Sequence, residues 1–74
     1  NTRFAENYNE FKALIELGGF IRCGWDGDPS SEAAIKLDTK ATIRCIFLDV
    51  SVAGKKCVYT GSPAKHEVVF ARAY

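Results

Sequence analysis

Apolar residues near the start of the chain recur at helical spacing, and four of them would share one helix face: Phe11, Leu14, Ile15 and Gly18. Asn7 lies before this run and Glu10 follows three residues later, which is typical of a helical capping box. Gly18-Gly19 then supplies residues that end a helix in the left-handed conformation. The pattern predicts a helix over residues 8–17.

Asp28-Pro29 marks a second helix start, because aspartate caps a helix and proline fits its first turn. We expect this helix over residues 29–38, with three apolar residues packed inward: Ala33, Ala34 and Leu37.

Alternating apolar residues predict strands at five places: 2–5, 20–25, 42–48, 57–59 and 67–73. The second strand would carry Ile21, Cys23 and Trp25 on one face. The third would carry Ile43, Cys45 and Phe47 on one face. Because helices that follow strands favour crossover connections, the order predicts an α+β fold. We expect a two-layer α/β sandwich, a mixed sheet with two helices on one face, in a single domain of residues 1–74.

Composition narrows the possible functions. Ten Lys and Arg against nine Asp and Glu give a net charge of +1, which argues against a strongly basic nucleic-acid surface. No run of about 20 apolar residues predicts a membrane span, and the start lacks a secretory signal pattern. The chain has no methionine and opens on Asn1, so we interpret it as a piece of a longer protein.

Three cysteines, without C-x-x-C spacing, are typical of reduced thiols in a cytoplasmic protein. We expect Cys23 and Cys45 to be buried on neighbouring strands and chemically inert, because each alternates with large apolar residues. Cys57 lies on a knuckle-like turn, and we expect it to be more accessible.

Residues suited to catalysis are few. His66 is the only histidine and no Gly-x-Ser-x-Gly motif accompanies it, so a solvated turn residue is expected. Asp26-Gly27-Asp28 resembles the start of a calcium loop, but its twelfth position is Leu37 rather than Glu. We interpret Asp28 as a helix cap. The residues alone predict no active site.

Three arginines on the predicted strands, Arg22, Arg44 and Arg72, could line one face of the sheet. Such a face would meet phosphates or the carboxylates of another domain. They could equally be solvated positions whose stems cover apolar neighbours.

Three runs carry a resemblance to a known family: GWDGDPSSE over residues 24–32, KLDTKATIRCIFLD over residues 36–49 and GKKCVYTGSPAKHEVVFARAY over residues 54–74. They resemble the C-terminal domain of prolyl-tRNA synthetase, in the archaeal- and eukaryote-like form that carries an extra domain after its anticodon-binding domain. The ATIRCI run and the FARAY ending are the most specific parts.

The resemblance implies that the full-length protein is a cytoplasmic class II aminoacyl-tRNA synthetase and a homodimer. It would activate proline with ATP and magnesium and attach the amino acid to its tRNA. The present residues would form a non-catalytic domain that supports the catalytic domain of the same chain, with no membrane partner.

In zinc-bearing members of this family four cysteines hold one metal, and their positions correspond here to Asp26, Ser31, Cys57 and Thr60. Only Cys57 is a cysteine. Because hydroxyl and carboxylate groups suit harder ions, the resemblance predicts that zinc is not bound. A harder core, a hydrogen-bonded Asp26 or neighbouring side chains would then replace the contribution that a metal makes to folding.

The resemblance also directs the end of the chain towards the proline and ATP site, which gives Tyr74 a supporting role there. The alternative is that Tyr74 only packs in a groove between domains. Two further functions stay open: an autonomous RNA-binding module that uses the arginines with Lys55, Lys56 and Lys65, and a metal-dependent structural knuckle.

Overall fold

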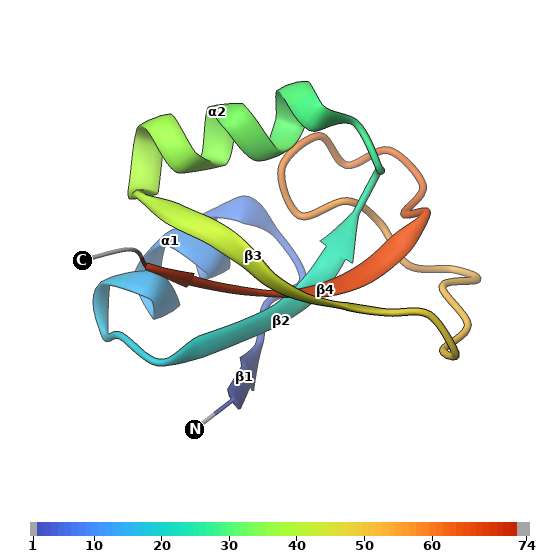
Figure 1. Ribbon diagram of the computed structural model, residues 1–74, viewed down its shortest axis with the longest axis horizontal. Coiled ribbons are helices and arrows are strands. Elements are labelled where there is room, and N and C mark those ends of the chain that lie inside the picture. Colours follow the sequence, from blue (N-terminus) through green and yellow to red (C-terminus); the bar gives the residue numbers. More distant parts are fainter. Residues whose placement is uncertain (1, 73–74) are drawn as a thin grey trace.

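The computed structural model describes residues 2–72 of the chain. Six elements follow one another: β1 (Thr2–Phe4), α1 (Tyr8–Glu16), β2 (Phe20–Trp25), α2 (Pro29–Thr39), β3 (Ala41–Phe47) and β4 (His66–Arg72) (Figure 1). Within the described range, these elements begin and end within one residue of the bounds that the sequence predicts. The predicted end of the last strand, at residue 73, lies outside the described residues.

The four strands form one mixed sheet in the order β1-β2-β4-β3. β1 pairs with β2 in parallel through the α1 crossover, whereas β4 pairs with both β2 and β3 in antiparallel fashion. β4, the last strand in the described range, therefore lies inside the sheet, between β2 and β3, although β2 comes much earlier in the sequence.

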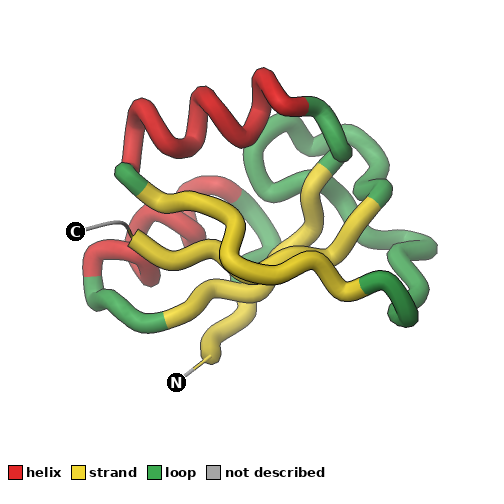
Figure 2. Tube along the Cα trace, viewed as in Figure 1, coloured by secondary structure: helices red, strands yellow, loops and turns green. Residues whose placement is uncertain are grey.

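Both helices contribute to a core on one face of this sheet (Figure 2). Phe11 of α1 meets Phe70 of β4 edge to face, with ring centroids 5.3 Å apart. Ile15, Ile21 and Ile35, from α1, β2 and α2, are at most 1% exposed in the same cluster. The predicted α+β sandwich with two helices on one face is confirmed.

The predicted helix caps are confirmed. The Asn7 side chain accepts a hydrogen bond from the Glu10 amide at 2.8 Å, and the Glu10 carboxylate accepts one from the Glu6 amide. Asp28 caps α2 by accepting from the Ser30 amide at 2.9 Å. These bonds satisfy amides that the first helical turn leaves without a partner.

The predicted inward face of α2 is wrong. Leu37 is 89% exposed, while the helix turns Ser31, Ile35 and Thr39 inward at a spacing of four residues. Two of these are polar and are tolerated because their hydroxyls are bonded; that of Thr39 donates to the Ile35 carbonyl. Because polar Ser31 and Thr39 are part of the buried face of α2, the positions of its apolar residues alone predict the wrong face.

The predicted face of β3 is also wrong, because the strand contains a bulge between Ile43 and Cys45. Ile43 pairs with Phe70 on the core side, but Cys45 pairs with Val69 on the other side. One extra residue in a strand exchanges the faces of everything that follows it. Cys45 is therefore exposed rather than buried.

Residues 48–65 form one long connection between β3 and β4, without the predicted strand at 57–59. The connection is held by backbone bonds instead: Val58 donates to the Gly24 carbonyl and Lys65 to the Trp25 carbonyl. Cys57 pairs with Gly24 as an isolated bridge and is 2% exposed, so the prediction of a more accessible Cys57 is wrong. Its backbone contact with the sheet carries its side chain into the core.

We predict that Gly24→Ala destabilises the protein by about 1–3 kcal/mol. A Cβ atom at Gly24 would lie 2.4 Å from the Lys56 carbonyl oxygen, so the 48–65 connection would have to shift. Chemical denaturation measures the loss. Ala53→Ser, on the exposed part of the same connection, is the control, with an effect within about 0.5 kcal/mol. An equal stability for Gly24→Ala and the wild type would contradict the close approach.

Candidate functional site

Three of the four positions that the resemblance assigns to zinc ligands lie close together: Asp26, Ser31 and Thr60. Asp26 follows β2, and its Oδ2 accepts hydrogen bonds from the Ser31 hydroxyl at 3.0 Å and the Thr60 hydroxyl at 3.2 Å. Its Oδ1 accepts from the Asp28 amide at 3.0 Å. The Asp26 carboxylate thereby links the end of β2, the first turn of α2 and the 48–65 connection.

This arrangement sets the protonation of Asp26. Burial alone would raise the pKa of its carboxyl, but the hydrogen bonds from the Asp28 amide and from the Ser31 and Thr60 hydroxyls outweigh it. The pKa of Asp26 lies below its ordinary value. The carboxylate is thus ionised at neutral pH and works as an acceptor for its three donors.

The donor set does not fit zinc. A structural zinc site holds the metal with four thiolate or imidazole ligands. Here the four corresponding positions carry one carboxylate, two hydroxyls and one thiol. Both oxygens of Asp26 are already engaged by the protein. Within residues 2–72 no group of three or more His, Cys, Asp or Glu side chains is placed to hold a metal ion.

The buried thiol of Cys23 also lies near this region. Burial raises the pKa of the Cys23 thiol to about 12, with smaller contributions from Cys57 and Glu67. Cys23 is 5% exposed, so the prediction of its burial is confirmed. Its chemical inertness stays a prediction that both observations favour. All three cysteines lie in the described range and each is a free thiol.

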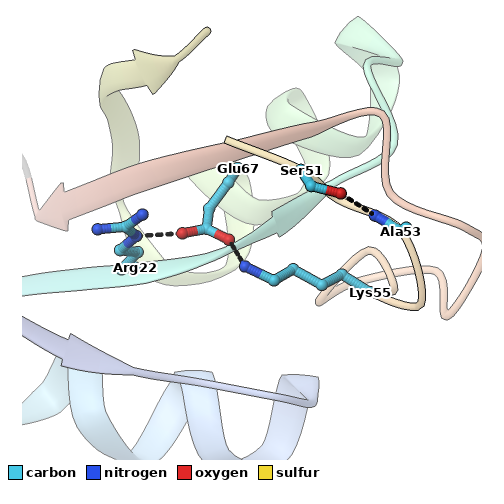
Figure 3. Close-up of polar contacts among 5 residues, drawn as sticks. All are labelled: Arg22, Ser51, Ala53, Lys55 and Glu67. Atoms are coloured by element: carbon cyan, nitrogen blue, oxygen red, sulfur yellow. Dashed lines mark hydrogen bonds and ion pairs between the residues drawn. The ribbon is translucent and has the colours of Figure 1, made fainter. Parts of the chain in front are cut away.

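A second polar cluster lies on the face of the sheet away from the helices (Figure 3). Glu67 of β4 is 3% exposed, and its two carboxylate oxygens accept from Arg22 of β2 and Lys55 of the connection. The Arg22 guanidinium also lies between two aromatic rings, 4.0 Å from the Phe47 centroid and 5.6 Å from that of Phe4. The cluster thus joins β2, β4 and the 48–65 connection around the Glu67 carboxylate.

Burial would raise the pKa of Glu67, but its bonds to Lys55 and Arg22 lower the pKa below its ordinary value. Sequence reasoning missed this cluster. Glu67 shares a strand face with Val69 and Ala71, opposite the more apolar face of Val68 and Phe70, and nothing local marks it as buried. Only the pairing of β4 with β2 brings Glu67 diagonally next to Arg22, and only the path of the 48–65 connection brings Lys55 to it.

The three strand arginines do not form one stripe. Arg22 lies on the face away from the helices, whereas Arg72 is on the helix side and pairs with Glu16 of α1 at 3.2 Å. Arg44 sits at the β3 bulge, is exposed, and donates to the Arg72 carbonyl at 3.4 Å. The stripe that an RNA-binding module would use is therefore not present among the described residues.

His66 begins β4 and is partly exposed, with its ring 5.7 Å from that of Trp25. The solvated turn position that the sequence predicts is thus replaced by a strand end beside an aromatic ring. Tyr74, the predicted active-site support, lies outside the described residues. No helix in the range 2–72 is long and apolar enough to cross a membrane.

The fold and the sequence define the class of protein. A solved structure of Giardia lamblia prolyl-tRNA synthetase, in complex with prolyl-adenylate, matches this fold with a TM-score of 0.80 and 25% identity; the match covers 99% of this chain and 16% of that one. The family model for the C-terminal region of prolyl-tRNA synthetase matches residues 8–74. This chain belongs to the prolyl-tRNA synthetase C-terminal family.

Individual relatives agree with this assignment. Proline–tRNA ligases from Azobacteroides pseudotrichonymphae and Porphyromonas gingivalis are 51% and 50% identical to this chain over 74 residues. Each match covers 100% of this chain and 15% of the relative. The resemblance seen in the sequence is confirmed, and the chain spans about one seventh of the length of these relatives.

We predict that the 74-residue chain folds without metal, because the Asp26 carboxylate holds the segments that a metal would link. Melting midpoints with and without a strong chelator should coincide, and elemental analysis should find no stoichiometric zinc. Asp26→Ala should lose about 1–2 kcal/mol of stability, since the Ser31 and Thr60 hydroxyls lose their acceptor. A midpoint lowered by the chelator would show that a metal contributes after all.

We also predict that stability falls in acid. Asp26 and Glu67 have pKa values below their ordinary ones, so their stabilising contribution is complete above about pH 5. The contribution is lost as the pH falls through their folded-state values. Glu67→Gln should cost about 2 kcal/mol at pH 7 and flatten the acid slope.

Lys55→Met is the control for Glu67→Gln, because the Lys55 side chain is 49% exposed and its pairing is screened by water. We expect a loss below about 1 kcal/mol. Denaturation curves between pH 2 and pH 7 measure both variants. An unchanged acid slope in Glu67→Gln would refute the role of that carboxylate.

Proposed function

We propose that this chain is an accessory domain of a proline–tRNA ligase that supports the catalytic domain and performs no chemistry itself. The observation that carries the proposal is the family match over residues 8–74 together with the share of the relatives that the chain spans. Its ionised groups also favour a structural role, because Asp26 and Glu67 have their oxygens engaged in holding the fold.

The full-length protein, on this proposal, uses ATP with magnesium to activate proline and then transfers the amino acid to its tRNA. The Giardia relative is in complex with prolyl-adenylate, which is the intermediate that such a reaction forms. We further propose that the protein works in the cytoplasm as a homodimer. The partner of the present domain is the catalytic domain of the same chain.

Tyr74 carries a phenol, and the family resemblance implies that it also carries the chain-terminal carboxylate. We propose that this carboxylate lies near the adenylate-forming site, where a fixed negative charge orients cationic groups or the ammonium of proline. Charge-assisted hydrogen bonds of this kind contribute about 1.5–3 kcal/mol each. Because 1.4 kcal/mol corresponds to a factor of ten, the effect on the reaction is measurable.

We predict that deleting residues 73–74 from the full-length enzyme lowers aminoacylation at least tenfold, chiefly in proline activation. ATP–pyrophosphate exchange measures that step, and circular dichroism checks that the fold is kept. Tyr74→Phe is the matched control, since it keeps the carboxylate and should retain most of the activity. Normal proline activation by the truncated enzyme would reduce Tyr74 to a packing residue.

A further inference from the structure

Neither α1 nor α2 lies over the second face of the sheet, although Glu67, Val69 and Ala71 on its strand β4 are 3%, 8% and 9% exposed. Its side chains lie in rows across the strands: Phe4, Arg22, Val69 and Cys45 in one row, Phe20, Ala71 and Thr42 in a second, and Gly24, Glu67 and Phe47 in a third. Residues opposite one another in paired strands share a face, so the strand register alone fixes these rows. Below we call them the open face.

The open face combines exposed apolar groups with positive charge. Phe4 is 66% and Phe20 45% exposed, and Cys45, on the edge strand β3, is also exposed. The carboxylate on this face is that of Glu67, whose two oxygens are taken by Arg22 and Lys55. A partner that covers the face must therefore bring apolar surface against Phe4 and Phe20 and an acidic or carbonyl group for Arg44.

Two hollows lie at opposite ends of the open face. One, of about 480 Å³, is lined by Phe4, Arg22 and Glu67 among others. The other, of about 320 Å³, lies between Phe20 and Arg44 over Ala71. Side chains that project from a partner would fill such hollows, and large exposed apolar patches commonly mark an interaction surface.

We propose that the open face is the surface on which the preceding, catalytic part of the full-length chain docks. This rests on the proposed function. About 85% of the length of the relatives lies outside the segment that matches this chain. The rest of such a polypeptide would be a partner that is covalently attached to this domain. Attachment holds such a partner at a high effective concentration, and a modest, partly apolar surface suffices to keep it bound.

Other occupants fit the face less well. A second copy docked face to face would place Arg22 and Arg44 against arginines of like charge, which disfavours association. RNA would need a row of cations to follow its backbone, but Arg72 lies on the other side of the sheet and Lys55 is paired with Glu67. Apolar rows with a few arginines match a protein surface better.

Cys45 reports on this docking because it lies within the open face and is exposed in the domain by itself. In the native full-length enzyme, alkylation of Cys45 by N-ethylmaleimide, followed by peptide mass spectrometry, should be at least 100-fold slower than in the unfolded chain. Cys23 and Cys57 are buried by the domain itself and serve as internal controls for its fold.

The double variant Phe20→Glu with Arg44→Glu should speed the labelling of Cys45 at least tenfold in the full-length enzyme, while Cys23 and Cys57 stay protected. Leu37→Glu is the matched control, because Leu37 is 89% exposed on α2 and lies outside the open face. It should leave the labelling of Cys45 unchanged.

Labelling of Cys45 at the rate of the unfolded chain overturns the proposal, and so does protection that the double variant leaves unchanged. Protection that appears only with added tRNA would make RNA the occupant, and protection that rises with enzyme concentration would indicate a second copy; each result overturns the proposal. If deletion of residues 73–74 lowers proline activation while Cys45 labels freely, the proposed function holds and this surface is wrong.

Discussion

The position of the long 48–65 connection depends on the buried carboxylate of Glu67. Glu67 lies on the inner strand β4, nearly without exposure, and its carboxylate binds Arg22 on the neighbouring strand and Lys55 on the 48–65 connection. A buried carboxylate needs such partners, because an unpaired charge away from water is strongly unfavourable. The pairing fixes where the connection lies against the sheet.

Asp26 plays the corresponding part just beyond the end of β2. It gathers the hydroxyls of Ser31 and Thr60 and an amide of the α2 turn around one ionised carboxylate. Where zinc-bearing relatives would use a metal to cross-link the same segments, this chain uses hydrogen bonds to a charged acceptor, which are roughly twice as strong as neutral ones. A long irregular connection is thereby anchored at two charged sites, on either side of Gly24, whose missing side chain admits the backbone between them.

The sequence predicted the helices and strands of the sheet correctly, but it did not predict which face of α2 and of β3 is buried. Caps at Asn7 and Asp28 act within one helical turn, so local pattern is sufficient to place the helix starts. The bulge in β3 depends on the register with β4, and it turned Cys45 from the expected core position to the open face. The inward hydroxyl of Ser31 depends on Asp26, which a count of apolar residues does not register.

By itself the sequence determined the α+β class, the two helices with their caps, and the membership in a family whose motifs span most of the chain. These follow from short-range periodicity and from identities at fixed positions. The tertiary structure alone decided which polar groups are buried and paired, that Cys57 is enclosed, and that both helices lie on the same face of the sheet. Such properties arise from contacts between residues that are 12 to 45 positions apart in the sequence. The energies of these contacts depend on geometry and burial in the folded protein, not on the residues adjacent in the sequence.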